Sequence, residues 1–528
     1  MNDAPFCYSK EGLSTRERHL HRIFETIPGA ISWSILIGLF LLTLLKPLIA
    51  CVVAIAFLFF WLLRLAYITI FLLLSFVRLK RREHDDWMRK ARRVDAVNIA
   101  RAQQTGTEPA ITLDALFHVV IMPVAREPYE VIAPAVIALS KQDFPLSRII
   151  VVYAVEERAP ESTKDAVRML QKDCSHFFHS FLVVMHPSGL PGEARVKGAN
   201  ATYAAKETAA VLRKQGIALS QATVSCFDAD TVVCPKYFSC LSYYFLQNQK
   251  RERASYQPIP VYHNNIWDVP NFSRVMETGS SFFQLVEATN PEKLVTFSSH
   301  SMSFKALDEI GYWPVDMISD DSAIFWKSYV HYDGDYAVIP MYITLSMDAN
   351  TADTPWHTAQ NIYKQRRRWA YGAENFPILM RAFVQNKQIP LYEKIRHGFK
   401  MLEGHVSWAT CGFLLTTMGW FPALMARREI HDSVLSYNEP RIAGTIFNIA
   451  TCALVITIFL SIAMLPKHHN HDRLRDRIKH ACEWALVPLV LLFLNAMPAL
   501  DAQTRLMFGK YMEFWVTEKS RKTTKRTA

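Results

Sequence analysis

The sequence predicts an α/β domain with a mainly parallel sheet, inserted between α-helical transmembrane segments. Two observations lead to this fold class. Half of the 528 residues are apolar although a fifth are charged, and the apolar residues are concentrated in long runs towards both ends of the chain. Between those runs, short stretches rich in valine and isoleucine alternate with helical patterns, as in a sheet covered by helices on both faces.

The predicted divisions of the chain follow this pattern. In order they are a polar, cytoplasmic N-terminal segment (1–28), a transmembrane helical hairpin (29–78), a charged connector (79–112), the α/β domain (113–375), amphipathic interfacial helices (376–403), C-terminal transmembrane helices (404–500) and an amphipathic, then basic tail (501–528). The first segment lacks the apolar core and cleavage site of a signal peptide.

The hairpin is predicted from the almost uninterrupted apolar run between Gly29 and Val77. A bilayer core needs roughly twenty helical residues, so this run is long enough for two helices. Lys46-Pro47 is the natural turn between them, and Arg64 either snorkels or faces another helix. Basic residues flank the hairpin on both sides (RERHLHR and RLKRR), which predicts a cytoplasmic location for both flanks.

The α/β domain is predicted from its strands and helices in turn. Buried strands are expected at 118–124, 148–155, 181–186 and 223–227, with helices at 130–142 and 162–173. Ligands bind at the carboxyl ends of the strands in such sheets, so functional residues are expected directly after each strand.

The C-terminal part offers two alternatives. PLYEKIRHGFKMLEGH is amphipathic and basic enough to lie on a membrane surface. Apolar segments follow at 406–425, 441–465 and 482–500. Three full spans would put the tail outside, although the 466–480 loop and the tail are both basic and favour the inside. Pro488 and Pro498 could instead break the last segment into a hairpin.

Composition excludes some other classes. The net charge of +11 comes from basic runs beside apolar segments, which indicates contact with membrane lipids rather than nucleic acid. The nine cysteines are scattered, without a CxxC pair, and predict reduced thiols facing a cytosol.

The stretch CFDADTVV places Asp228 and Asp230 at the end of an apolar strand. In an extended chain that spacing points both side chains the same way. Two adjacent carboxylates repel each other unless a cation lies between them, and oxygen ligands suit Mg²⁺ or Mn²⁺. The alternative is an ordinary turn or helix cap.

A second acidic pair, Asp320 and Asp321, follows the short apolar Met317-Ile318. One interpretation is a helix N-terminus capped by Ser319 or Asp320. The other is a general base that takes a proton from an attacking hydroxyl. Both can hold, because a capped helix end can project one acid into a cleft.

The stretch NIYKQRRRWAYG joins fixed positive charge to a large aromatic residue. On a helix, Gln365, Arg368 and Trp369 share one face, whereas Arg366 and Arg367 point elsewhere. A guanidinium suits a diphosphate and an indole suits a sugar ring. For Arg366 and Arg367, contact with lipid headgroups is the simpler interpretation.

In this order, DxD after a strand, an aspartate pair and QxxRW resemble the processive membrane glycosyltransferases of family 2, which include cellulose, chitin and hyaluronan synthases. The resemblance covers about residues 113–375 by motif. It implies a GT-A-type nucleotide-sugar-binding domain.

The resemblance also implies a role for each matching residue. Asp228 and Asp230 would bind the nucleotide diphosphate through Mg²⁺ or Mn²⁺, and Asp321 would be the catalytic base. The donor, most simply a UDP-sugar, would contact Glu156, Lys197, Asp228 and Arg368. The acceptor and diphosphate would contact Gln365, Arg368, Trp369 and Asp320. The segment from His300 to Lys305 takes the place of the acceptor-side loop.

The sequence departs from the family pattern at three places. Glu156-Glu157 stands where the family has an aspartate after the second strand. The triplet before the base is Ser319-Asp320-Asp321 rather than Thr-Glu-Asp, although its last acid is kept. The acceptor-side loop lacks the glycine-rich pattern, which leaves the acceptor open.

The implied reaction is transfer of a sugar, with inversion, from a cytosolic nucleotide-sugar to a glycan acceptor, with export of the chain across the cell membrane. One alternative is transfer of a single sugar to a lipid, as in ceramide glucosyltransferase. Another is a membrane receptor or transporter that only binds a nucleotide and does not need Asp321.

Overall fold

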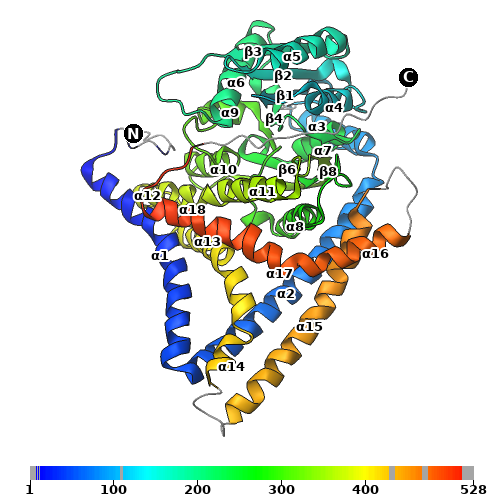
Figure 1. The fold of residues 1–528 in the computed structure, drawn as a ribbon. Coiled ribbons are helices and arrows are strands. Elements are labelled where there is room, and N and C mark those ends of the chain that lie inside the picture. The colour runs from blue at the N-terminus through cyan, green and yellow to red at the C-terminus, as the bar shows by residue number, and fades with distance from the viewer. Residues whose placement is uncertain are drawn as a thin grey trace.

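A computed structural model describes residues 8, 10, 12–106, 111–426, 434–466 and 474–513. It places a layered sheet domain against a set of long helices that extend away from it (Figure 1). Residues 467–473 of the predicted basic loop, the basic part of the tail and the first seven residues lie outside the described residues.

Within the described residues the sheet has eight strands in the order β3-β2-β1-β4-β7-β6-β8-β5. The strands are β1 (Phe117–Val124), β2 (Ile149–Glu156), β3 (Ser180–His186), β4 (Ala222–Cys226), β5 (Val232–Val233), β6 (Ala254–Val261), β7 (Ser301–Ser303) and β8 (Ala337–Ser346). Strands β3, β2, β1 and β4 run parallel, as do β6 and β8, whereas β7 and β5 are antiparallel to their neighbours.

The four strands predicted from the sequence correspond to β1 to β4, each within one residue at either end. The second half of the sheet was not predicted. Strands β6 and β8 contain prolines, which are unfavourable in a sheet interior, and their ladder is irregular between Gln257 and Ile259.

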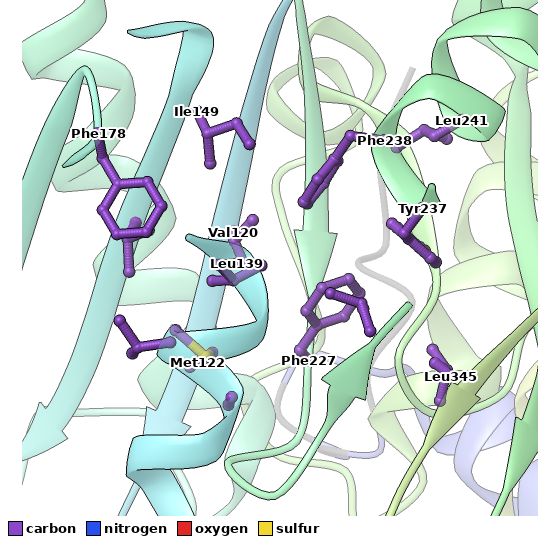
Figure 2. Packing of buried hydrophobic residues seen from close by; sticks show 14 of the residues in the cluster. Val120, Met122, Leu139, Ile149, Phe178, Phe227, Tyr237, Phe238, Leu241 and Leu345 are labelled. Carbon is purple, nitrogen blue, oxygen red and sulfur yellow. The ribbon is translucent and has the colours of Figure 1, made fainter. Parts of the chain in front are cut away.

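Alternate side chains of each strand point to opposite sides of the sheet, so these mainly apolar strands form a core on each face. Val120 and Met122 of β1 face a core that includes Leu139 and Leu241 (Figure 2). Val119 and its alternate neighbours on β1 and β2 face a second core on the other side. The near-continuous burial of β1 and β2 explains their predominantly apolar sequence.

The helices of the domain cover these two faces. The first core is covered by α4 (Tyr129–Leu139), α5 (Glu161–Cys174) and α7 (Tyr237–Gln247), and the second by α6 (Lys197–Lys214), α9 (Phe304–Glu309) and α10 (Asp320–His331). The connector forms α3 (Trp87–Thr105), which packs on α7 through the Trp87 and Tyr243 rings.

Helices α8 (Asn271–Glu287), α11 (Pro355–Ala370) and α12 (Asn375–Gln385) lie on the side of the domain that faces the long helices (Figure 1). The QRRRW stretch forms the last turn and a half of α11, and a short 3₁₀ turn, η7 (Tyr371–Glu374), leads into α12. Thr354 caps α11, since its side chain accepts a hydrogen bond from the His357 N–H (3.1 Å).

The predicted hairpin forms α1 (Thr15–Leu45) and α2 (Pro47–Glu83), with the turn at Lys46 as expected. Arg64 of α2 faces another helix, since it forms an ion pair with Glu403. The C-terminal helices are α13 (Leu391–Thr417), α14 (Phe421–Ala426), α15 (Val434–Met464), α16 (Leu474–Glu483), α17 (Val487–Leu489), the π-helical η9 (Val490–Ala496) and α18 (Met497–Met507).

Four helical segments in the described part of the chain are long and apolar enough to cross a membrane. They are Thr15–Leu45, Pro47–Glu83, Gly444–Met464 and Ile478–Met507. The predicted segment 406–425 is not among them, because the chain leaves α13 after Thr417 and resumes as the short α14 at Phe421. In Figure 1, α13 and α14 nevertheless extend away from the sheet domain beside α1 and α2.

The last apolar segment differs most from the prediction. From α16 to α18 it crosses the other long helices directly beneath the sheet domain instead of running alongside them (Figure 1). Val490 packs with Ile362 of α11, and Ala499 and Leu506 pack with Tyr371. Polar contacts from α18 to α11 and α1 hold the segment there, including Gln503 to Ser32.

Candidate active site

Three of the predicted functional residues, Lys197, Asp228 and Asp321, meet at the carboxyl end of the parallel strands. Lys197 begins α6, and its Nζ lies 2.7 Å from Asp228 Oδ1 and 3.0 Å from Asp321 Oδ1. Burial alone would lower the pKa of Lys197, but Asp228 and Asp321 raise it well above its ordinary value. The lysine therefore stays charged and joins three segments that are far apart in the sequence.

Asp228 is held by two consecutive serines that lead into β7. The Ser298 hydroxyl donates to Asp228 Oδ2 (2.7 Å), and the Asp228 N–H donates to Ser299 Oγ (3.3 Å). Ser299 Oγ also lies 2.9 Å from Thr231 Oγ1. Ser299 has φ +63°, a left-handed backbone that is unfavourable for residues with a Cβ. The DxD turn is therefore clamped by a strained segment.

Asp230 does not share the environment of Asp228. The strand ends at Cys226, and the Thr231 N–H donates to the Asp228 carbonyl, so both aspartates lie in a turn. The assumption of an extended chain was therefore wrong. Asp230 is fully buried, and its Oδ2 accepts a hydrogen bond from the Asp348 N–H (2.9 Å).

Asp320 and Asp321 occupy the first turn of α10, where the helix dipole favours negative charge. Asp321 is partly exposed, whereas Asp320 is 3% exposed. Burial, reinforced by the neighbouring Asp321 charge, raises the pKa of Asp320 to about 8. Asp320 therefore holds its proton more tightly than an ordinary aspartate does.

Gly198 allows the first turns of α6 and α10 to approach each other. A Cβ at this position would lie 2.4 Å from the Pro314 carbonyl oxygen and 3.0 Å from Asp320 Cβ. Any larger residue would push Lys197 away from Asp321, so the glycine in RVKGAN has a steric reason.

The three arginines of QRRRW contact three different elements. Burial lowers the pKa of Arg368, and the nearby charges of Asp228, Asp320 and Asp321 oppose this effect in part. Arg366 is buried and paired with Glu277 of α8 (3.2 Å). Arg367 is paired with Asp501 of α18 (2.8 Å). The interpretation that Arg366 and Arg367 bind lipid headgroups was therefore wrong.

Three other predicted site residues lie on α11, the helix that carries Arg368, or at the end of β2. The Trp369 ring is half-buried and carries the Arg366 guanidinium 4.5 Å from its centroid. Gln365 is half-buried on the same helix. Glu156 ends β2 at the same edge of the sheet and is ion-paired with Arg158.

The predicted acceptor-side segment begins at His300, which is fully buried. Its Nδ1 lies 3.0 Å from the Phe297 carbonyl oxygen, so Nδ1–H is the donor. Burial, the largest effect, lowers the pKa of His300, which makes the neutral ring the stable form.

Sequence reasoning missed Glu374, a buried acid that contacts the start of α10. Its Oε1 accepts hydrogen bonds from the Ile318 N–H (3.1 Å), the Ser319 N–H (3.0 Å) and the Ser319 hydroxyl (2.7 Å). The predicted capping by Ser319 is absent from this described helix end: its hydroxyl donates to Glu374 and its Oγ accepts from Asn375 Nδ2. An acid within the apolar stretch WAYGAENFPILM was the available signal.

The cluster combines cations for an anionic group with a carboxylate able to accept a proton. A family model described as glycosyl transferase family group 2 matches residues 223–494, just over half of the chain. The chain belongs to this family.

It is therefore a glycosyltransferase, and its sheet domain is the GT-A-type domain expected from the sequence, flanked by apolar helices. The matched region includes the DxD turn, the Asp320-Asp321 pair and the QRRRW helix of this family member.

Curated relatives match a short part of this glycosyltransferase. Poly-beta-1,6-N-acetyl-D-glucosamine synthase of Staphylococcus epidermidis is 32% identical over 90 residues, which are 16% of this chain and 19% of that protein. The synthase of Staphylococcus aureus (strain COL) is 33% identical over 91 residues, with the same shares. The alignments thus span under a fifth of the length of these relatives.

Solved structures include the mannosyltransferase PcManGT from Pyrobaculum calidifontis in complex with GDP-Man and Mn²⁺. Its TM-score is 0.39 at 14% identity, over 80% of this chain and 100% of that chain. TarS 1-349 of S. aureus in complex with UDP-GlcNAc has a TM-score of 0.35 at 12% identity, over 75% of this chain and 91% of that chain.

Proposed function

We propose that this glycosyltransferase is a membrane-bound, inverting enzyme that transfers a sugar from a nucleotide-sugar to a polysaccharide acceptor. One observation carries the proposal: Lys197 bridges Asp228 and Asp321, with Arg368 close to both carboxylates. Fixed cations and a carboxylate base within one cluster are what displacement of a diphosphate by a hydroxyl requires.

On the donor side, Lys197 and Arg368 would bind the diphosphate and stabilise the negative charge that develops on it as it leaves. Glu156 would contact the nucleotide from the end of β2, where nucleotides bind in such sheets. A guanidinium and an ammonium that are already held in place need little reorganisation during the reaction.

Asp321 would act as the general base. It is partly exposed, and the Thr296 hydroxyl donates to its backbone carbonyl (2.7 Å), which fixes the chain at the start of α10. It would accept the proton of an acceptor hydroxyl that attacks the anomeric carbon from the side opposite the diphosphate, which inverts that carbon. Asp320, Gln365 and Trp369 would line the acceptor side.

The residues fit a divalent cation at the DxD turn. Asp228 and Asp230 lie in one turn, and carboxylate oxygens suit Mg²⁺ or Mn²⁺. Among the described residues, no three His, Cys, Asp or Glu side chains cluster to hold a metal by themselves. Asp228 and Asp230 would therefore hold it together with the diphosphate, whose charge it would offset.

We further propose that α1, α2, the α13–α14 pair and α15 cross the cell membrane, with the sheet domain in the cytosol. The segment Ile478–Met507 would lie at the membrane surface, because it packs beneath the sheet domain through Asp501, Val490 and Leu506. This arrangement keeps the basic loop and the tail on one side, as their charge favours.

The polysaccharide acceptor, with chain export, is supported by the polysaccharide named in the curated relatives. Transfer of a single sugar to a lipid is the alternative, and the product decides between them. Membership in a glycosyltransferase family favours either of these reactions over the receptor or transporter alternative.

The test is release of nucleoside diphosphate by the purified full chain in detergent, across UDP- and GDP-sugars, with Mg²⁺, Mn²⁺ or EDTA. We expect metal-dependent release with one donor and at least about 100-fold less with Asp321→Asn, since a general base contributes about 10²–10⁴-fold. Equal rates for the variant and the parent would contradict the proposal. Product length then separates polymer from single transfer.

A further inference from the structure

We propose that Glu374 is a positioning residue that ties the base-carrying turn of α10 to the arginine-carrying helix α11. The inference rests on the proposed role of Asp321 as the base. Glu374 lies in η7, directly after the helix that carries Arg368, and it contacts the residues directly before Asp320. Glu374 would then help to set the position of the base relative to the diphosphate-binding cation.

The contacts are concentrated on one carboxylate oxygen. Oε1 of Glu374 accepts from two consecutive backbone N–H groups and from the Ser319 hydroxyl, at 2.7 to 3.1 Å. Hydrogen bonds to a carboxylate are stronger than those between neutral groups. Three of them on adjacent donors fix the backbone at Ser319, and with it the direction in which the next two side chains leave.

Asn375 adds a second tie between the same two segments. Its Nδ2 donates to Ser319 Oγ (3.0 Å), Ser322 Oγ (3.1 Å) and the Gly372 carbonyl (3.1 Å). The contacts therefore bracket Asp320 and Asp321, with one serine before the pair and one after it. A rigid connection of this kind holds catalytic groups in place, and a displacement of about 1 Å can cost about 100-fold in rate.

Burying the carboxyl group of Glu374 costs desolvation free energy, so its presence in the interior calls for a functional reason. Glu374 is 2% exposed, and burial raises its pKa to about 7 although the bonds to Ser319 lower it. A neutral apolar residue would fill the same space without that desolvation cost. A buried acid that accepts hydrogen bonds from the segment directly before a proposed base is the pattern expected of a positioning residue.

The experiment compares Glu374→Ala with Glu374→Gln in the full chain, using the parent and Asp321→Asn as references. The glutamine oxygen can accept the same three hydrogen bonds, whereas alanine leaves the donors without an acceptor. We expect Glu374→Ala to lower kcat about 10- to 100-fold. The donor KM, and the binding of UDP or GDP measured by titration calorimetry, should stay within about 3-fold because Lys197 and Arg368 remain. Glu374→Gln should recover most of kcat.

A matched control is Glu483→Ala, which removes a buried acid of α16 that is paired with Arg274 of α8 and His480 of α16. It should lower the melting temperature without a selective loss of kcat per folded molecule. The inference is overturned if Glu374→Ala keeps the kcat of an active parent, or if its loss lies in donor binding. If Glu374→Ala does not fold, the test passes to Ser319→Ala, which removes one of the hydrogen bonds to Glu374. This variant should have a lower kcat at an unchanged donor KM. A parent-like kcat of Ser319→Ala would then overturn the inference.

The two proposals fail in different ways. A parent that releases no nucleoside diphosphate, or an Asp321→Asn variant that matches it, overturns the proposed function. An active parent, an inactive Asp321→Asn and a parent-like Glu374→Ala overturn the positioning role alone.

Discussion

Lys197 and Asp321 form an ion pair between the first turns of α6 and α10, with Nζ 3.0 Å from Oδ1. The same ammonium lies 2.7 Å from Asp228, so one cation separates the carboxylate of the DxD turn from the proposed base. Without it, those two carboxylates would face each other with Arg368 as the remaining nearby cation. Lys197 therefore balances the charge of the two carboxylates and is also a candidate hydrogen-bond donor to the diphosphate.

Lys197→Met should lower kcat/KM by at least about 100-fold, comparable to the loss of one preorganised donor at a developing negative charge. Lys197→Arg keeps the charge and should retain more activity, although its longer planar head cannot reproduce both contacts. Steady-state release of nucleoside diphosphate measures both variants. Equal activities for the methionine and arginine variants would show that the charge is not what matters at this position.

Ser299 allows backbone strain to be separated from hydrogen bonding. Ser299→Ala and Ser299→Gly both remove the hydroxyl that accepts from the Asp228 N–H and contacts Thr231. Only glycine also removes the strain of the left-handed backbone conformation, which costs about 1–2 kcal/mol for other residues. Both variants should lose activity to a similar degree, whereas the glycine variant should melt at the higher temperature. A glycine variant with parental activity would show that the hydroxyl does not position Asp228.

The first half of the sheet and most of the site could be predicted because their signals are local. Strands β1 to β4 are short, mainly apolar runs, and the acids of β2 and β4 stand at or just after the strand ends. Strand β6 (ASYQPIPV) is buried throughout despite two prolines, because its neighbours β7 and β8 supply an irregular ladder that no local pattern reveals.

The remaining errors arise from contacts that are distant in the sequence. Glu277 and Asp501, which pair with Arg366 and Arg367, lie 89 and 134 residues away, so a lipid-facing interpretation was the simpler one. The capping of α10 was misassigned for the same reason, since Glu374 is 55 residues from Ser319. A run of basic residues in the sequence predicts contacts with negative groups, but it does not show which acidic residue or lipid provides them.

Glu374 also predicts a pH dependence of stability. Its folded pKa of about 7 lies above the ordinary value of 4.5, so the folded state holds the proton more tightly than the unfolded state does. The associated stability is present below pH 4.5 and is lost as the pH rises through about 7. The full shift corresponds to about 3 kcal/mol.

Glu374→Gln removes this titration while keeping the hydrogen-bond acceptor. The melting temperature of the variant minus that of the parent should therefore increase between pH 5 and pH 8, measured by tryptophan fluorescence in detergent. Asp320, whose pKa is also raised, titrates in both proteins and cancels in the difference. A difference that does not change with pH would contradict the buried, titrating carboxylate.

The crosswise course of the segment from α16 to α18 predicts the membrane topology. Asp501 and Gln503 contact α11 and α1 on the side of the sheet domain, so residue 513 should lie on the same side as that domain. The turn between α1 and α2, at Lys46, lies at the end of these helices that is far from the sheet domain (Figure 1).

The sides can be read from single cysteines at the exposed positions Glu161, Glu513 and Lys46, in a chain without its native cysteines. A membrane-impermeant maleimide labels only the cysteines on the side to which it is added. In inverted membrane vesicles, Glu161→Cys and Glu513→Cys should be labelled and Lys46→Cys protected, with the reverse in intact cells. Labelling of Glu513→Cys together with Lys46→Cys would mean that Ile478–Met507 crosses the bilayer, and its packing beneath the sheet domain would then have to be wrong.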